Sequence, residues 1–189
     1  MENQEFKQKI NKLYSKMEYR PVGVAVLYRV KKNQPEFLII QSAKDPSAWL
    51  FPQGGIEKGE DKKMNLEREL EEELGVSFNS DLSNFCYGFH YDELDAESAR
   101  KDKRGFSKGK AYFASLAKYS GNEKFSLQAE EIADAKWMNY KKAIQYFNQG
   151  RSKKAKLSKK ILSKANKKVQ GGYLEWKPKQ KPNLLDWQH

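Results

Sequence analysis

The order of apolar and polar positions along the chain predicts alternating strands and helices. Segments with apolar residues every three or four positions predict helices, and short runs of β-branched and aromatic residues predict strands. The first two strands form a predicted hairpin around the turn at 31–35, and the polar segment 92–108 is a predicted exposed loop. The predicted helices are 3–17, 62–74, 140–148 and 153–168, and the predicted strands are 22–30, 37–41, 49–52, 82–91, 110–119 and 132–138.

This order of elements predicts the fold class and the domain organisation. Strands around one central helix, with another helix late in the chain, indicate an α/β sandwich. At 189 residues the chain is long enough for one domain and an extension. We expect residues 1–150 to form the domain, beginning with an N-terminal helix in 1–18, and residues 151–189 to form a basic helical extension with an aromatic and proline-rich tail.

The central segment 54–76 predicts a glycine-rich turn, a helix and a glycine stop. Gly54 and Gly55 favour a turn after the strand at 49–52, and Gly75 favours the end of the helix. Within the helix, leucines recur every four residues and form the expected buried stripe. These leucines are Leu66, Leu70 and Leu74.

Three glutamates of this helix share one side of it, because Glu69, Glu72 and Glu73 stand at positions i, i+3 and i+4. Like charges at these spacings repel by about 0.2–0.5 kcal/mol per pair, and the helix dipole disfavours anions near the C-terminus. Mg²⁺ or Mn²⁺ would neutralise the three carboxylates, since hard cations prefer carboxylate oxygens. The alternative is an acidic helix that is merely solvated.

The spacing resembles the Nudix hydrolase family, whose pattern is G-x5-E-x7-R-E-U-x-E-E-x-G-U, with U a bulky aliphatic residue. The resemblance implies an α-β-α sandwich with a mixed sheet, and metal-dependent hydrolysis of a phosphoanhydride bond in a nucleoside polyphosphate. The matching positions are Gly54, Glu60, Arg68, Glu69, Leu70, Glu72, Glu73, Gly75 and Val76.

The resemblance also implies a set of ligands for the metal, Mg²⁺ or Mn²⁺. Glu131 lies six residues before Trp137, the spacing of an additional acidic ligand in related sequences; the alternative is a surface acid in a loop. The catalytic groups are expected among the glutamates, with Glu72 or Glu73 favoured as general base and Glu131 after them. The implied ligands are Glu69, Glu72, Glu73, Glu131 and the backbone oxygen of Gln53.

Four further residues of the pattern are expected to be structural. Glu60 and Arg68 form an expected ion pair that fixes the loop against the helix. The alternative for Arg68 is a pair with Glu72, one helical turn later. Gly54 and Gly75 are expected to serve the backbone at the two ends of the segment.

The flanks of the motif narrow the family. The segments YRPVGVAVL (19–27) and WLFPQGGI (49–56) resemble the branch of RNA 5′-pyrophosphohydrolases and diadenosine polyphosphate hydrolases. At 107–113 the chain reads SKGKAYF, where that branch has a Gly-Gln-x-Gln-Lys-Trp-Phe run, so its nucleotide-recognition residues do not carry over. The candidate substrate contacts are Arg20, Lys44, Lys108 and Lys110.

The positive charge of the chain is concentrated in its last part. Residues 151–189 hold twelve Lys/Arg and two Asp/Glu, a net charge of +10. The remaining 24 of 36 basic and 23 of 25 acidic residues leave a net charge of +1 in residues 1–150. A basic segment with interspersed aromatic residues suits RNA, so contact with RNA through 151–189 is one interpretation. A solvated basic helix with a capping tail is the other.

These observations predict an enzyme that hydrolyses 5′-triphosphorylated RNA or a dinucleoside polyphosphate. Two alternatives stay open: a pyrophosphatase for free (d)NTPs or other nucleoside diphosphate derivatives, and an RNA-binding regulator with an incidental Nudix fold. The longest apolar run, 22–28, is too short to span a bilayer, and the first 17 residues contain no apolar signal region. We therefore expect a cytoplasmic protein without a membrane partner.

Overall fold

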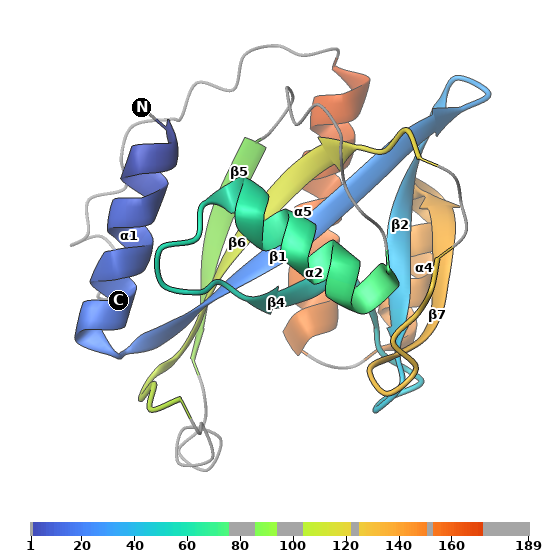
Figure 1. The fold of residues 1–189 in the computed structure, drawn as a ribbon. Helices are drawn as coiled ribbons and strands as arrows, with labels where there is room; N and C mark the ends of the chain where they lie inside the picture. Colours follow the sequence, from blue (N-terminus) through green and yellow to red (C-terminus); the bar gives the residue numbers. More distant parts are fainter. Residues whose placement is uncertain (1, 76–85, 94–103, 122–124, 151–152, 172–189) are drawn as a thin grey trace.

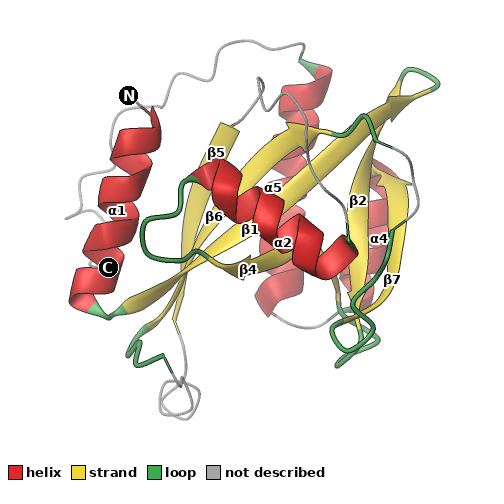
Figure 2. Ribbon diagram, in the orientation of Figure 1, coloured by secondary structure: helices red, strands yellow, loops and turns green. Residues whose placement is uncertain are grey.

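The computed structural model describes residues 2–75, 86–93, 104–121, 125–150 and 153–171. Within these residues a mixed sheet of seven strands lies between two layers of helices (Figure 1, Figure 2). The expected α-β-α sandwich is confirmed. The helices are α1 (Glu2–Lys16), α2 (Lys62–Leu74), α4 (Tyr140–Gln149) and α5 (Lys153–Gln170), and the strands are β1 (Tyr19–Lys31), β2 (Gln34–Ser42), β3 (Trp49–Leu50), β4 (Gln53–Gly55), β5 (Cys86–Glu93), β6 (Gly109–Lys118) and β7 (Ile132–Asn139).

Successive residues of β1 face opposite layers, because side chains alternate along a strand. Val24 and Val26 pack with α4 and α5 on one face, whereas Ala25 and Leu27 pack with α2 on the other. Helix α1 contributes a third cluster, in which Phe6 packs on β6, and the helix lies beside β5 and β6 in Figure 1. The apolar core therefore lies on both faces of the sheet.

Strands β1 and β2 form the predicted hairpin and then diverge. They pair over Tyr28–Lys31 and Gln34–Phe37, joined by Lys32 and Asn33 at φ 49° and 59°, as tight hairpin turns require. Beyond this point β1 pairs in parallel with β6, while β2 pairs with β3 and β7. The divergence of the two strands can be followed in Figure 1.

The turn predicted at Gly54 and Gly55 is wrong. Residues Gln53–Gly55 are the extended strand β4, which pairs antiparallel with Val22–Val24 of β1. The local preference of glycine for turns is outweighed because β1 offers the strand a partner for its backbone. Because these two glycines have no side chain, other groups can approach the strand closely.

Helix α2 has the predicted bounds. The carboxylate of Asp61 accepts a hydrogen bond from the Met64 N–H (2.9 Å), which caps the first turn, and Gly75 ends the helix in the left-handed conformation at φ 63°. Its three leucines are buried against the sheet. The central helix is therefore fixed by its own sequence at both ends and along its apolar face.

Helix α5 packs on the body of the protein. Leu157, Leu162 and Ala165 are buried in the same cluster as Ala143 and Phe147 of α4. The predicted helix is confirmed, and the boundary at 150 stays a prediction. The first part of the predicted strand 82–91, most of the loop 92–108 and the tail after 171 lie outside the described residues. No helix among those described is long and apolar enough to cross a membrane.

Candidate active site

A cleft of about 220 Å³ is lined by residues of β1 and β2, where these strands diverge. Its other walls come from β3, β4, β6, α2, α5 and the segment that leads into β7. One group of predicted site residues lines it with acidic or oxygen-bearing groups, and another lines it with cations. The first group is Gln53, Gly54, Glu73 and Glu131, and the second is Arg20, Lys44 and Lys110.

The backbone of β4 directs the Gln53 carbonyl away from β1. The Ala25 N–H donates to the Pro52 carbonyl (2.8 Å), and bonded and non-bonded pairs alternate along an antiparallel ladder. Gln53, opposite Val24, therefore belongs to a non-bonded pair, and its carbonyl is not used by this ladder. The carbonyl of Gly55, two residues on, points the same way and accepts a hydrogen bond from α2.

Glu69 and Glu73 are buried carboxylates on the side of α2 that faces β4, with relative exposures of 6% and 7%. Burial raises the pKa of both. For Glu73 the negative charges of Glu69 and Glu131 add to the effect and bring the pKa to about 8, although a backbone hydrogen bond from Gln53 opposes it. One Glu73 oxygen, Oε2, is buried and has no hydrogen-bond partner among the described residues.

The position of the Glu69 side chain requires a glycine at residue 54. A Cβ on Gly54 would lie 1.7, 2.0 and 2.2 Å from Oε2, Cδ and Oε1 of that carboxylate. The Glu69 side chain therefore occupies the volume that a side chain at 54 would fill. The sequence pattern anticipates the glycine, and the close approach explains it.

Arg68 organises the acidic side of the site. Its guanidinium donates to Glu60 Oε1 (2.7 Å), Glu69 Oε1 (2.7 Å) and Glu72 Oε2 (3.2 Å), and to the Gly55 carbonyl (2.7 Å). Arg68 is thus paired with Glu60 and also with Glu72, the two partners considered for it from the sequence. Hydrogen bonding to Glu60 raises the pKa of Arg68. Burial opposes ionisation of Glu60, but the hydrogen bonds from Arg68 and the backbone outweigh it and lower the Glu60 pKa.

Asn65 is a site-supporting residue that the family pattern does not contain. It is buried, and its Nδ2 donates to the Gly55 carbonyl (3.2 Å) and to Glu60 Oε2 (3.3 Å). Its side chain fills the space above Gly23, where a Cβ would lie 1.8 Å from Oδ1. The sequence does contain one signal for the burial of Asn65, because this polar residue stands next to Leu66 of the apolar stripe.

The two other predicted acids are exposed. The Glu72 side chain is 56% exposed, and the Glu131 side chain is 51% exposed and paired with Lys44 at 3.2 Å. Among the described residues, no group of three or more His, Cys, Asp or Glu is close enough to form a metal cluster. Nη1 of Arg68 contacts a carboxylate oxygen of Glu69 at 2.7 Å and one of Glu72 at 3.2 Å, so the guanidinium bridges these two side chains.

The donor set nevertheless fits a divalent cation. Glu73 carries a buried oxygen without a described partner, and the carbonyl of Gln53 points away from β1. A buried carboxylate with a raised pKa is stabilised when a cation replaces its proton. Glu69, Glu72 and Glu131 are the carboxylates that would complete such a site.

The cationic side of the cleft differs from the prediction at two positions. Lys108 does not line the cleft, and its ammonium is paired with Glu18 at 2.8 Å. Lys154 of α5 lines it and was not predicted. Lys154 falls on the same side of α5 as the buried Ser158 and Ala165, so a lysine on the inward stripe was the available signal.

The raised pKa of Glu73 predicts a pH-dependent stability for the protein kept free of metal by a chelator. Between the ordinary pKa of 4.5 and the folded value of about 8, the native state binds more protons than the unfolded state. The free energy of unfolding should therefore fall as pH rises through this window. Urea denaturation between pH 5 and 9 should show a smaller fall for Glu73→Gln. Equal slopes for both proteins would mean that folded Glu73 is ionised at neutral pH.

The family model for the NUDIX domain matches residues 19–161. The chain belongs to the Nudix family. The match begins with β1 and includes α2 and the first half of α5. Nudix hydrolases generally use divalent metal ions, which agrees with the fit of the acidic side of the cleft.

Curated relatives of this Nudix protein include two bacterial proteins named RNA pyrophosphohydrolase. The protein from a Nitratiruptor species is 34% identical over 134 residues, which cover 69% of this chain and 84% of the relative. The protein from a Sulfurovum species is 30% identical over 152 residues, which cover 79% of this chain and 94% of the relative.

Solved structures show the same fold at low identity. The C. elegans Ap4A hydrolase in a binary complex superposes with a TM-score of 0.59 at 21% identity, covering 80% of this chain and 98% of that one. The E. coli dihydroneopterin triphosphate pyrophosphohydrolase gives a TM-score of 0.56 at 15% identity, with coverages of 78% and 96%.

Proposed function

We propose that this Nudix protein hydrolyses a phosphoanhydride bond at the 5′ end of triphosphorylated RNA, or in a dinucleoside polyphosphate. The observation that carries the proposal is that the buried carboxylate of Glu73, next to that of Glu69, and several cationic side chains line opposite sides of one cleft. The two sides are complementary to a polyphosphate chain with bound cations. The names of the two bacterial relatives support RNA as the substrate.

The residues of the cleft have separable tasks in this proposal. Glu69, Glu73 and the Gln53 carbonyl would hold Mg²⁺ or Mn²⁺, with Glu131 as a further ligand. The cation supplies charge neutralisation on the phosphates and lowers the pKa of a water molecule. Glu72 has an exposed carboxylate, so it reaches solvent and can accept a proton there. Glu73 is the other candidate for the general base.

Arg20, Lys110 and Lys154 line the cleft as a cationic wall and would bind phosphate oxygens. Arg20 and Lys110 are direct neighbours across the parallel pair of β1 and β6, so their side chains leave the same face of the sheet. Lys154 reaches the cleft from α5. The three cations approach from the sheet and from a helix, so they can contact one phosphate chain from two sides.

A substrate panel tests the proposal. Turnover of triphosphorylated RNA, diadenosine tetraphosphate and free nucleoside triphosphates is compared with Mg²⁺ and with Mn²⁺, and the products are identified. The proposal expects kcat/KM to be highest for RNA or the dinucleotide. A higher kcat/KM for free nucleotides would replace it with the pyrophosphatase alternative, and binding of RNA without any turnover would favour a regulator.

The exposed side of α5 is proposed to bind RNA beyond the 5′ end. The helix contains no acidic residue, and four exposed lysines follow one stripe that begins two residues after Lys154. Their spacing of four, four and three residues keeps them on one side of the helix. These lysines are Lys156, Lys160, Lys164 and Lys167.

Removing two lysines of this stripe, in Lys160→Ala/Lys164→Ala, should weaken RNA binding and spare small nucleotides. We expect KM to rise for triphosphorylated RNA and not for free nucleotides. The slope of log Kd against log salt should fall by about 1.4, at about 0.7 per lost phosphate contact. The matched control is Lys12→Ala/Lys16→Ala on α1, another exposed pair of lysines four residues apart. Equal effects of both pairs would assign the effect to net charge.

A further inference from the structure

Two arginines meet over Gly55, a residue that lines the cleft. A Cβ on this glycine would lie 2.8 Å from Nη1 of Arg104 and 2.9 Å from Nη2 of Arg20. Burial raises the pKa of Tyr14, and both guanidinium groups lie near enough to its hydroxyl to oppose that rise. Arg20 comes from β1 and Arg104 from the turn that leads into β6, so residues far apart in sequence place two positive charges together.

The Arg20 side chain is not fully satisfied by the described part of the protein. Its Nε is buried and finds no hydrogen-bond partner there, and no carboxylate of that part forms an ion pair with its guanidinium. A buried donor without a hydrogen-bond partner destabilises the folded protein, and a neighbouring like charge adds to the destabilisation. An anion placed between the two arginines would accept a hydrogen bond from the unpaired donor and would reduce the repulsion between the two positive charges.

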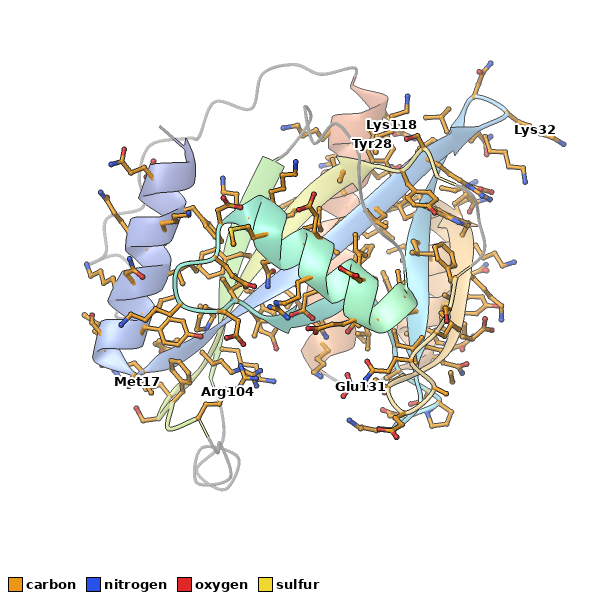
Figure 3. The ribbon with its side chains drawn as sticks, in the orientation of Figure 1. Met17, Tyr28, Lys32, Arg104, Lys118 and Glu131 are labelled. Atoms are coloured by element: carbon orange, nitrogen blue, oxygen red, sulfur yellow. The ribbon has the colours of Figure 1, made fainter. Side chains whose placement is uncertain are left out.

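This pair lies on the opposite face of β4 from the buried carboxylates. Gly54 faces the Glu69 carboxylate, and Gly55, the next residue of the strand, faces the two arginines. Successive positions of a strand point to opposite faces, so the Glu69 carboxylate and the two arginines lie on opposite faces of β4. Arg20, Gly54, Gly55 and Glu73 all line the same cleft. In Figure 3, Arg104 lies below the start of β6 and Glu131 below α2, both along the lower edge of the view.

We propose that Arg20 and Arg104 form an anion site, which binds a phosphate group of the substrate other than the one next to the divalent cation that the carboxylates would hold. Guanidinium groups bind phosphate oxygens through two parallel hydrogen bonds, which fixes orientation as well as charge. The phosphate belongs either to the 5′ polyphosphate chain or to the RNA backbone. The inference rests on the proposed function for the identity of the substrate. Arg104 lies outside the motif and its flanking segments, so the sequence alone did not predict it as a substrate contact.

The test measures binding in a chelator, where turnover does not occur. Arg104→Ala is the informative variant, because Arg104 is exposed and its replacement leaves the core untouched. The ligands are a nucleoside 5′-triphosphate and RNA oligonucleotides with a 5′-triphosphate or a 5′-hydroxyl end. Lys108→Ala is the matched control, since it removes one positive charge four residues away, outside the cleft.

We expect Arg104→Ala to raise Kd for 5′-triphosphorylated RNA about tenfold, the loss of one charge-assisted hydrogen bond, and Lys108→Ala to change it less than about twofold. Arg20→Lys should give a similar rise, because an ammonium cannot reproduce the two parallel contacts. An equal rise in Kd for the nucleoside triphosphate would show that the two arginines bind a phosphate of the polyphosphate chain. A rise in Kd for 5′-hydroxyl RNA, with no rise for the nucleoside triphosphate, would show that they bind a phosphate of the RNA backbone.

Equal Kd values for wild type and Arg104→Ala with all three ligands would overturn the anion site. So would equal effects of Arg104→Ala and Lys108→Ala. Either result leaves the proposed hydrolysis intact, because turnover is measured separately with metal present. Conversely, a protein that hydrolyses none of the substrates but loses affinity on Arg104→Ala would overturn the proposed function and support the anion site.

Discussion

Replacing Glu73 by glutamine is expected to lower kcat by about 10²- to 10⁴-fold, the range for loss of a positioned catalytic carboxylate. Glu73 is buried beside Glu69, has one oxygen without a described partner and lines the cleft. Glutamine keeps the size of the side chain but removes the negative charge that a divalent cation requires. The decisive measurement is steady-state turnover of triphosphorylated RNA across a range of Mg²⁺ and Mn²⁺ concentrations.

Glu71→Gln is the matched control for this variant. Glu71 is an exposed residue of the same helix, two positions away, and its replacement makes the same change in charge without facing the cleft. We expect kcat of this control to stay within about a factor of two of wild type, as for surface positions generally. If both variants lost activity equally, the helix would act through its overall charge, and the assignment of Glu73 would be wrong.

Replacing Arg68 by alanine is expected to lower the free energy of unfolding by on the order of 3 kcal/mol. The substitution leaves Glu60 and Glu69 buried, at side-chain exposures of 11% and 7%, without their cation. It also removes the donor to the Gly55 carbonyl, which ties α2 to β4. Activity should fall as well, because β4 carries both the Gln53 carbonyl and Gly54. Urea denaturation of the metal-free protein at pH 7 measures the loss.

Two further variants separate the network from ordinary surface charge. Arg68→Lys should recover only part of the stability, since an ammonium cannot span the acceptors that the planar guanidinium reaches. Lys63→Ala removes the exposed pair with Glu67 on the same helix, at 3.7 Å, and should change stability by less than about 0.5 kcal/mol. A loss for Arg68→Ala no larger than for Lys63→Ala would show that the network is not stabilising.

Helix α2 could be predicted to the residue because its determinants are local. Asp61, Gly75 and the leucine stripe lie within the helix or next to it, so no distant partner is needed to place them. The same holds for the hairpin of β1 and β2, whose turn lies between strands adjacent in sequence. Local signals therefore predicted the element that carries most of the acidic residues of the site.

The parts of the site that depend on distant pairing could not be predicted in this way. Strand β4 exists because β1 accepts a partner at Val22–Val24, and nothing within Gln53–Gly55 indicates that partner. Arg104 reaches Arg20 because β6 lies beside β1. The spacing of the glutamates placed them on one side of α2, but their different burial is set by how closely β4 approaches the helix.

The parallel pairing of β1 with β6 has a consequence for how the protein forms during synthesis. Tyr19–Tyr28 must wait for Gly109–Lys118, about ninety residues later, before its longest ladder can close. The hairpin with β2 can form early, whereas Arg20 cannot meet Lys110 and Arg104 until β6 has left the ribosome. A nascent chain stalled before residue 109 would therefore contain the acidic helix, Arg20 and Lys44 but not Lys110 and Lys154, so the cationic wall of the cleft would be incomplete.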